Sequence, residues 1–309
     1  MTFDGSISNP PYTNSDGTKV YPDFIEEMAN FTDGLWTAIV PGGWACGTSI
    51  APKFRRNVVN DNIDVEDVSF VSDSNSGFVG VTTGSGYSVV TGGSNRSWFG
   101  INGNEVSRLK LQKLDVIPRL ASAVEAAHAI QNSETEVLSD VQIFADRFGM
   151  GKVSGKSDIH GFKFKNEKGS GDVKVATSFG LKYVDRALLS NDLQSTWSVA
   201  TPKLAGFPFP GFGNYSFVLP PDVIHSDSYV SFPVASEFEA KNLLSYLSTE
   251  FAKAMVISRQ PHFCMTVTSF SWIPLVDLSR PWSDDTLLDG LPTAGLSGSV
   301  IKAVVESLT

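Results

Sequence analysis

Residues 1–12 read MTFDGSISNPPY, and the tetrapeptide Asn9-Pro10-Pro11-Tyr12 that ends this stretch decides how the chain is interpreted. A short apolar stretch from Phe3 to Ile7 leads into it and predicts a strand followed by a loop. The two prolines fix their φ angles and hold the Pro10 carbonyl group still. That carbonyl and the side-chain oxygen of Asn9 are hydrogen-bond acceptors, and Tyr12 adds a flat aromatic face. The sequence therefore predicts a rigid loop that presents two acceptors.

Strand and helix patterns alternate through the first part of the chain. The predicted helices have proline in their first turn or apolar residues at helical spacing, and the predicted strands are apolar runs. The expected elements are a helix at Tyr21–Phe31, a strand at Leu35–Val40, a helix at Pro52–Asn60, a strand at Ile63–Val71 and a hairpin of Phe78–Thr83 with Tyr87–Thr91. This order predicts half of an α/β sheet with an antiparallel finish.

The pattern changes after a segment rich in Gly, Asn and Ser at residues 94–104. We therefore predict one domain over residues 1–104 and a second over residues 105–309, which the length of 309 residues allows. The second domain is expected to contain a helix at Val116–Gln131, strands at Ser216–Leu219, Ser228–Val234 and Thr266–Pro274, and one strong helix with an apolar face from Ala240 to Met255 behind a Ser236/Glu239 capping box.

The composition is that of an ordinary globular protein, with 41% hydrophobic and 18% charged residues. The net charge of −9 weighs against nucleic-acid binding, although a local basic face is sufficient for it. Cys46 and Cys264 are the only two cysteines, so a reducing compartment is the default and we expect a cytoplasmic protein. We recognise no signal peptide and no apolar run long enough for a membrane span, so no membrane partner is expected.

A series of short motifs occurs in the same order as in a known family. They are Asn9-Pro10-Pro11-Tyr12, Ile39-Val40-Pro41-Gly42-Gly43-Trp44, Lys53-Phe54-Arg55-Arg56, Phe78-Val79-Gly80-Val81, Ser269–Leu275 and Trp282–Leu287. With these motifs the chain resembles the amino-methylating DNA methyltransferases of restriction-modification systems, in the type II group whose catalytic motif precedes a large target-recognition region. The motifs are similar to the family's catalytic loop, its Ile-Pro-Ser-Arg-Trp turn, a Phe-Arg helix, a Phe-Pro-Gly-Val segment and a closing segment.

The resemblance implies an α/β fold with a partial, Rossmann-like methyltransferase sheet, followed by an α+β target-recognition domain. It also implies that Asn9, Pro10, Pro11 and Tyr12 are catalytic. A flipped adenine would stack on Tyr12. Its amine would give hydrogens to the Asn9 side chain and the Pro10 carbonyl while positive charge develops on it.

Further side chains are candidates for contacts with the base and with DNA. Trp44 and Phe78 are candidates for the base pocket, with core packing as the alternative. Residues 145–186 are loop-rich and basic, and we interpret Gly151–Ser157 as a basic loop rather than a phosphate-binding loop. The candidate DNA contacts in this region are Lys152, Lys156, Lys163 and Lys165.

Two departures from the family pattern affect the expected function. The family binds S-adenosylmethionine with an Asp/Phe-x-Gly-x-Gly loop, and we find none before Asn9 or between Gly213 and Thr309. We therefore expect S-adenosylmethionine to be bound largely by a second chain that carries this motif. In addition, Gly42-Gly43 stands where the family has Ser-Arg, which removes a cation near the catalytic face.

The leading hypothesis is a bacterial or phage-encoded subunit or fragment of a site-specific adenine-N6 DNA methyltransferase, which binds double-stranded DNA and is active with a partner chain. The alternative is a catalytically inactive protein of methyltransferase ancestry that binds or builds a phage particle or a defence complex, and the acidic charge favours it. A third possibility is a DNA-recognition module for a nuclease. The histidines lack the spacing of metal ligands, so no metal site is predicted.

Overall fold

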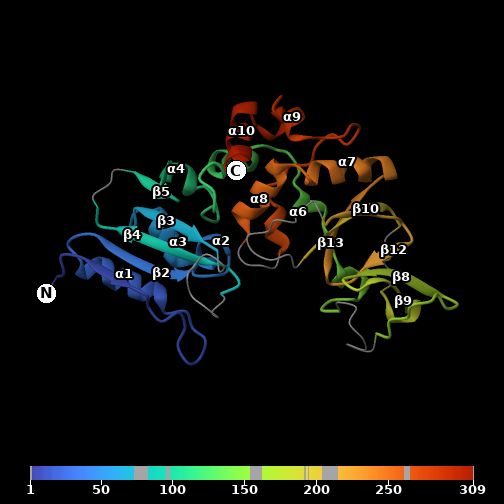
Figure 1. Ribbon diagram of the computed structural model, residues 1–309, viewed down its shortest axis with the longest axis horizontal. Helices are drawn as coiled ribbons and strands as arrows, with labels where there is room; N and C mark the ends of the chain where they lie inside the picture. Colours follow the sequence, from blue (N-terminus) through green and yellow to red (C-terminus); the bar gives the residue numbers. More distant parts are fainter. Residues whose placement is uncertain are drawn as a thin grey trace.

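The structure is a computed structural model that describes residues 2–72, 83–94, 98–153, 162–190, 193, 195–203, 215–260 and 265–308. Figure 1 shows the first sheet and its helices at one end of the molecule, the β8–β9 hairpin at the other, and C-terminal helices between and above them. The predicted sites Phe78 and Lys156 lie outside the described residues.

A mixed sheet of six strands fills the first end within the described residues. Its strands are β1 (Ser6–Ser8), β2 (Trp36–Pro41), β3 (Asp67–Val71), β4 (Tyr87–Gly92), β5 (Phe99–Ile101) and β6 (Asn104–Val106). The strand order is β1-β2-β4-β3-β5-β6, with β1 parallel to β2, β4 antiparallel between β2 and β3, and β5 parallel to β3. Tyr87–Thr91 of the predicted hairpin lies in β4, which is antiparallel to both of its neighbours, whereas residues 78–82 of the other predicted strand lie outside the described residues. β1 lies at one edge of the sheet.

Short helices connect the strands of this sheet and cover one of its faces. They are α1 (Tyr21–Phe31), α2 (Gly43–Cys46) and α3 (Pro52–Val59), and the first has the predicted bounds. Along β2 the side chains of Trp36, Ala38 and Val40 are at most 1% exposed, while Thr37 and Ile39 between them are only half-buried. This alternation with a period of two shows that the helices cover one face of the sheet more completely than the other.

Two smaller sheets make up the middle of the chain. Their strands are β7 (Ile143–Phe144), β8 (Asp172–Thr177), β9 (Gly180–Asp185), β10 (Trp197–Pro202), β11 (Phe217–Leu219), β12 (Val223–His225) and β13 (Tyr229–Val234). One sheet has the order β11-β10-β13-β7 and the other β12-β8-β9. The predicted strands at Ser216–Leu219 and Ser228–Val234 are therefore confirmed as β11 and β13, one residue shorter each.

The remaining helices belong to the same core as the first sheet. They are α4 (Arg108–Leu111), α5 (Ala123–Asn132), α6 (Leu138–Val141), α7 (Glu237–Leu247), α8 (Glu250–Arg259), α9 (Asp284–Leu287) and α10 (Gly298–Glu306). One continuous hydrophobic cluster runs from Trp36 of β2 through Ala127 of α5 and Met255 of α8 to Ile301 of α10. A separate cluster, which includes Phe148, Val175 and Ile224, lies under the β8–β9 hairpin. The core of the first sheet thus extends into the C-terminal half of the chain.

Three predicted elements of the C-terminal half are wrong. The helix expected at Val116–Gln131 begins only at Ala123, because the backbone N–H groups of Ile117 and Arg119 donate to the carbonyls of Ala45 and Ser258 instead. The helix expected through Ala240–Met255 is two helices, since Thr249 caps the N-terminus of α8. The strand expected at Thr266–Pro274 contains a 3₁₀ helix over Val267–Phe270.

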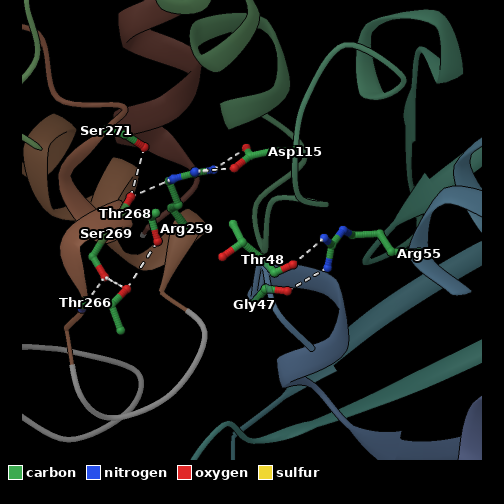
Figure 2. Close-up of polar contacts among 9 residues, drawn as sticks. All are labelled: Gly47, Thr48, Arg55, Asp115, Arg259, Thr266, Thr268, Ser269 and Ser271. Carbon is green, nitrogen blue, oxygen red and sulfur yellow. Dashed lines mark hydrogen bonds and ion pairs between the residues drawn. The ribbon is translucent and has the colours of Figure 1, made fainter. Parts of the chain in front are cut away.

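Two buried arginines lie near the junction between the first sheet and the C-terminal helices, as Figure 2 shows. The Arg55 Nη1 atom donates to the carbonyls of Trp44 and Gly47, each at 2.7 Å, and so closes the end of α2. The Arg259 guanidinium binds both carboxylate oxygens of Asp115 at 2.5–2.6 Å and donates from Nε to the Thr268 carbonyl. Arg55 thus ties α3 to α2, and Arg259 ties α8 to the segment before α5.

Candidate acceptor-base site

The loop Asn9–Tyr12, called the acceptor loop below, begins directly after β1. Asn9 and Pro11 are exposed, Tyr12 is half-buried, and Pro10 is buried. In an open α/β sheet, ligands bind outside the carboxyl ends of the strands. The acceptor loop stands at that position on the edge strand, and it is not enclosed in the core.

A hydrogen bond inside the loop orients the side chain of Asn9. The Tyr12 hydroxyl donates to Asn9 Oδ1 at 2.8 Å. Burial and the neighbouring Tyr87 raise the pKa of Tyr12, so the hydroxyl keeps its proton at neutral pH and remains a donor. An amide oxygen has two lone pairs. Asn9 Oδ1 can therefore accept one further hydrogen, for example from an amine.

The segment after the acceptor loop closes on itself before α1. The Val20 N–H donates to the Tyr12 carbonyl at 3.3 Å, and Thr13 and Lys19 form an isolated antiparallel bridge. The Thr18 N–H donates to Asn14 Oδ1 at 2.8 Å, which stabilises the turn between them. The acceptor loop is thus held at both ends, by β1 on one side and by this turn on the other.

Two residues that the sequence analysis did not single out lie behind Tyr12. The rings of Tyr12 and Tyr87 have centroids 6.3 Å apart and are inclined at 55°. A methyl group on the Cα atom of Gly42 would lie 3.4 Å from the Tyr87 carbonyl oxygen and 3.2 Å from Arg119 Nη1. Because Gly42 has no side chain, the Arg119 guanidinium can lie against this turn. A cation therefore does lie beside Gly42-Gly43, but it comes from a distant part of the chain.

Arg119 is held firmly in this place. It is 3% exposed, and its Nε and Nη2 atoms donate to the carbonyls of Gln260 and Ser85, each at 2.9 Å. No local sequence pattern could have identified Arg119, because the residues that surround it are far apart in the sequence, among them Gly42, Ser85 and Gln260. Tyr87 could have been found only as an aromatic residue in a predicted strand.

The structure places Trp44 in the core. Its side chain is 0% exposed, its ring lies 4.8 Å from that of Phe54, and its Nε1 atom donates to Ser88 Oγ at 2.9 Å. This is the core-packing alternative stated above, and a contact with a flipped base stays a prediction. Trp44 and Tyr12 belong to the same hydrophobic cluster, so Trp44 supports the region behind the acceptor loop.

The predicted DNA-binding lysines that the structure describes lie around the β8–β9 hairpin. Lys152 and Lys163 are exposed. Lys165 forms an ion pair with Asp172 at 2.9 Å, and the Asp172 side chain is 2% exposed. The hydrogen bond from Lys165 and a backbone N–H from Gly169 lower the pKa of Asp172, so this carboxylate stays charged. Lys165 therefore has a structural partner, whereas Lys152 and Lys163 present their charge at the surface.

Three surface hollows have volumes of about 430, 390 and 710 Å³, and none of the three is lined by Asn9, Pro10, Pro11 or Tyr12. Within the described part of the chain, no group of three or more His, Cys, Asp and Glu side chains could hold a metal ion. None of the described helices has both the length and the apolar character needed to cross a membrane.

No protein-family model matches the chain, and no curated protein matches it either. Two solved structures are similar to it at low levels. The type IIG restriction endonuclease BpuSI has 13% sequence identity and a TM-score of 0.32, and the match covers 96% of this chain and 45% of that chain. The type IIL restriction-modification enzyme MmeI, in complex with DNA, has 10% identity and a TM-score of 0.40. That match covers 87% of this chain and 46% of the MmeI chain. This chain spans less than half the length of either protein.

Proposed function

We propose that this chain supplies the acceptor-base site and the target-recognition domain of a site-specific DNA adenine-N6 methyltransferase. The observation that carries the proposal is the acceptor loop itself. It follows an edge strand, Asn9 is exposed, and Tyr12 holds the Asn9 side-chain oxygen in one orientation. The exposed Asn9 side-chain oxygen, together with the carbonyl of the neighbouring buried Pro10, would bind a base amine and stabilise the charge that develops on it.

In this proposal, each residue of the acceptor loop makes a different contact with a flipped adenine. The Asn9 side chain and the Pro10 carbonyl accept the two hydrogens of the exocyclic amine, which draws the amine out of conjugation with the ring. The face of Tyr12 supports the base by stacking. S-adenosylmethionine would supply the methyl group, and a second polypeptide that carries an Asp/Phe-x-Gly-x-Gly loop would bind it.

The basic middle part of the chain supports DNA as the partner. Residues 145–190 contain nine Lys and Arg against five Asp and Glu, although the whole chain has a net charge of −9. A local basic surface of this kind attracts DNA phosphates. Lys152 and Lys163 are exposed and would make such contacts.

Methyl transfer to duplex DNA, measured with tritiated S-adenosylmethionine and the donor-binding polypeptide present, tests the proposal. We expect Asn9→Ala to lower the transfer rate at least about 100-fold, the usual effect of losing a transition-state hydrogen-bond acceptor or donor. Asn30→Ala is the matched control, because Asn30 is also exposed but lies on α1. Equal rates for the two variants would contradict the proposal.

One observation favours a catalytically inactive binding protein as the second candidate. Residues 2–35, which contain the acceptor loop, carry six Asp and Glu and only one Lys. Such a surface repels phosphates and suits a protein partner better than DNA. If the cellular role of the chain survives Asn9→Ala, this second candidate is favoured over the methyltransferase.

A further inference from the structure

A hollow of about 390 Å³ lies between α3 and the segment that follows α4, apart from the acceptor loop. Its volume falls within the range of about 300–1,000 Å³ that is usual for small-molecule sites. Its walls include Arg55, Arg56 and Val59 on one side and Leu111, Gln112 and Asp115 on the other, and we call it the arginine hollow. Figure 2 shows Arg55 and Asp115 on their separate segments.

Positive charge is in excess around the arginine hollow. Arg55 and Arg56 are the cations among its described lining residues, and Asp115 is the carboxylate. Both oxygens of Asp115 already bind the Arg259 guanidinium, at 2.5–2.6 Å, so this carboxylate is neutralised. Arg56 is exposed and forms no ion pair with any residue that the structure describes. Two guanidinium charges therefore stay without a counterion here, although the whole chain has a net charge of −9.

One of these two charges is buried. Arg55 is 6% exposed, and its Nη1 atom donates to the carbonyls of Trp44 and Gly47, which satisfy hydrogen bonds but carry no net charge. Burial is the main cause that lowers the pKa of Arg55, Asp115 raises it, and the charge of Arg56 lowers it further. The two guanidinium groups thus repel each other, and an anion that binds beside both would relieve this repulsion.

The rest of the arginine hollow supplies apolar walls and neutral donors. Val59, Leu111 and Leu114 line it and are buried. Thr48 and Gln112 also line it and are exposed, and their hydroxyl and amide groups can donate hydrogen bonds to an oxyanion. The hollow is therefore cationic on one side and apolar on the other, which suits a ligand that has an anionic head and an apolar part.

We propose that the arginine hollow binds a small phosphate monoester whose organic group is short and apolar. A phosphate monoester carries a charge of about −1.5 to −2 at pH 7, which matches the two guanidinium charges. Arg56 binds the phosphate oxygens directly, since guanidinium groups form strong hydrogen bonds with phosphate, and Arg55 contributes its buried charge. The organic group packs against Val59, Leu111 and Leu114. The bound ligand then bridges α3 and the segment after α4.

Isothermal titration calorimetry of the full chain with butyl phosphate tests this inference. We expect saturable binding, and we expect inorganic phosphate to bind at least about tenfold more weakly, because it leaves the apolar walls in water. Absence of saturable binding of butyl phosphate overturns the inference. Equal affinities for the two probes also overturn it, because the apolar walls would then have no role.

Substitutions of exposed residues locate the bound probe. We expect Arg56→Gln to lower the affinity for butyl phosphate at least about tenfold, and Gln112→Glu to lower it as much by repulsion. Lys53→Gln is the control, because Lys53 is exposed on the same helix and does not line the arginine hollow. It should change the affinity less than about threefold. Equal affinities for Arg56→Gln and Lys53→Gln would place the probe elsewhere and overturn the inference.

Two further readouts separate ligand binding from loss of structure and from binding of DNA. Without the probe, Arg56→Gln should melt at the Tm of the native chain, and butyl phosphate should raise the Tm of the native chain only. Duplex DNA added in competition should leave the affinity for butyl phosphate unchanged. If duplex DNA displaces the probe in an Arg56-dependent manner, the arginine hollow is a contact for DNA phosphates, and the assignment to a small monoester is overturned.

Discussion

At the residue scale, the proposed function gives Tyr12 two separable roles: its hydroxyl, which donates to Asn9 Oδ1, would orient Asn9, and its ring would stack on the base. We expect Tyr12→Phe to slow methyl transfer about 2–10-fold, because a hydrogen bond contributes about 0.5–1.5 kcal/mol. Tyr12→Ala also removes the stacking face, worth about 1–3 kcal/mol for a base on an aromatic ring. Single-turnover rates of the assembled enzyme compare the two variants. A Phe variant as slow as the Ala variant would show that the ring is not a stacking surface.

His225 makes the stability of the middle sheets depend on pH. Its imidazole is 0% exposed, with Nδ1 3.0 Å from the Ser226 carbonyl and Nε2 3.0 Å from Ser231 Oγ. Burial is the main cause that lowers its pKa from 6.5 to about 4. As the pH falls, the unfolded chain takes up this proton first. The contribution of neutral His225 to stability is therefore complete above pH 6.5 and is lost as the pH falls toward 4.

We expect this histidine alone to lower the free energy of unfolding by about 2 kcal/mol between pH 7 and pH 5. Urea unfolding at the two pH values, for the native chain and for His225→Gln, isolates the effect from that of the carboxylates. The glutamine variant should lose less stability over this interval by about the same amount. The same pH dependence in both proteins would mean that His225 does not carry it.

At the scale of elements, helix α1 shows what the sequence can determine. Its proline in the first turn and its apolar spacing are local signals, and the predicted bounds were correct. The break between α7 and α8 was missed because Leu243, Leu247, Phe251 and Met255 keep a spacing of four residues through it. The spacing of apolar residues alone cannot show that Thr249 caps a new helix.

The acceptor loop could be predicted from local sequence signals, whereas the residues that surround it could not. Asn9–Tyr12 was identified from the chain because the residue types, the prolines and the preceding strand are adjacent in sequence. Tyr87 and Arg119 were not identified, because only the fold brings them to Tyr12 and Gly42. Segment 116–119 was wrongly predicted as helix. Its backbone N–H groups donate to the carbonyls of Ala45 and Ser258, which are distant in sequence and leave no local signal.

An ion pair contributes to the contact between α8 and the segment before α5. The Asp115 carboxylate binds the buried Arg259 guanidinium, and although burial raises the pKa of Asp115, the hydrogen bonds from Arg259 lower it overall. We expect Asp115→Ala to destabilise the fold by about 2 kcal/mol, because Arg259 keeps its charge and loses two charge-assisted hydrogen bonds. Thermal or urea unfolding measures this, with exposed Asp289→Ala as the control. Equal stability of the two variants would show that the ion pair is not needed at the junction.

The lysines around the β8–β9 hairpin differ in their contacts. Lys165 pairs with Asp172, whereas Lys163 is exposed and would contact DNA in the proposed function. We expect Lys163→Ala to weaken binding to duplex DNA and to reduce the slope of log affinity against log salt by about 1, the effect of one lost phosphate contact. Lys165→Ala instead leaves the buried Asp172 without its cation and lowers the melting temperature. Filter binding at several salt concentrations, with a melting curve for each variant, distinguishes them. A changed slope for Lys165→Ala without loss of stability would reverse the assignment.

At the scale of the whole molecule, charge is distributed unevenly. The end that carries the acceptor loop is acidic, and the region around the β8–β9 hairpin is basic. If the chain binds DNA as proposed, the DNA phosphates are attracted to the basic region and repelled by the acidic end that carries Asn9.

The continuous hydrophobic cluster that joins β2 to α10 has a consequence for biosynthesis. Trp36 is synthesised long before Ile301 and Val304, which belong to the same cluster. The nascent first sheet must therefore keep part of its apolar surface unprotected until α10 has been synthesised. Chaperones that shield such surfaces are expected to bind this polypeptide during that interval.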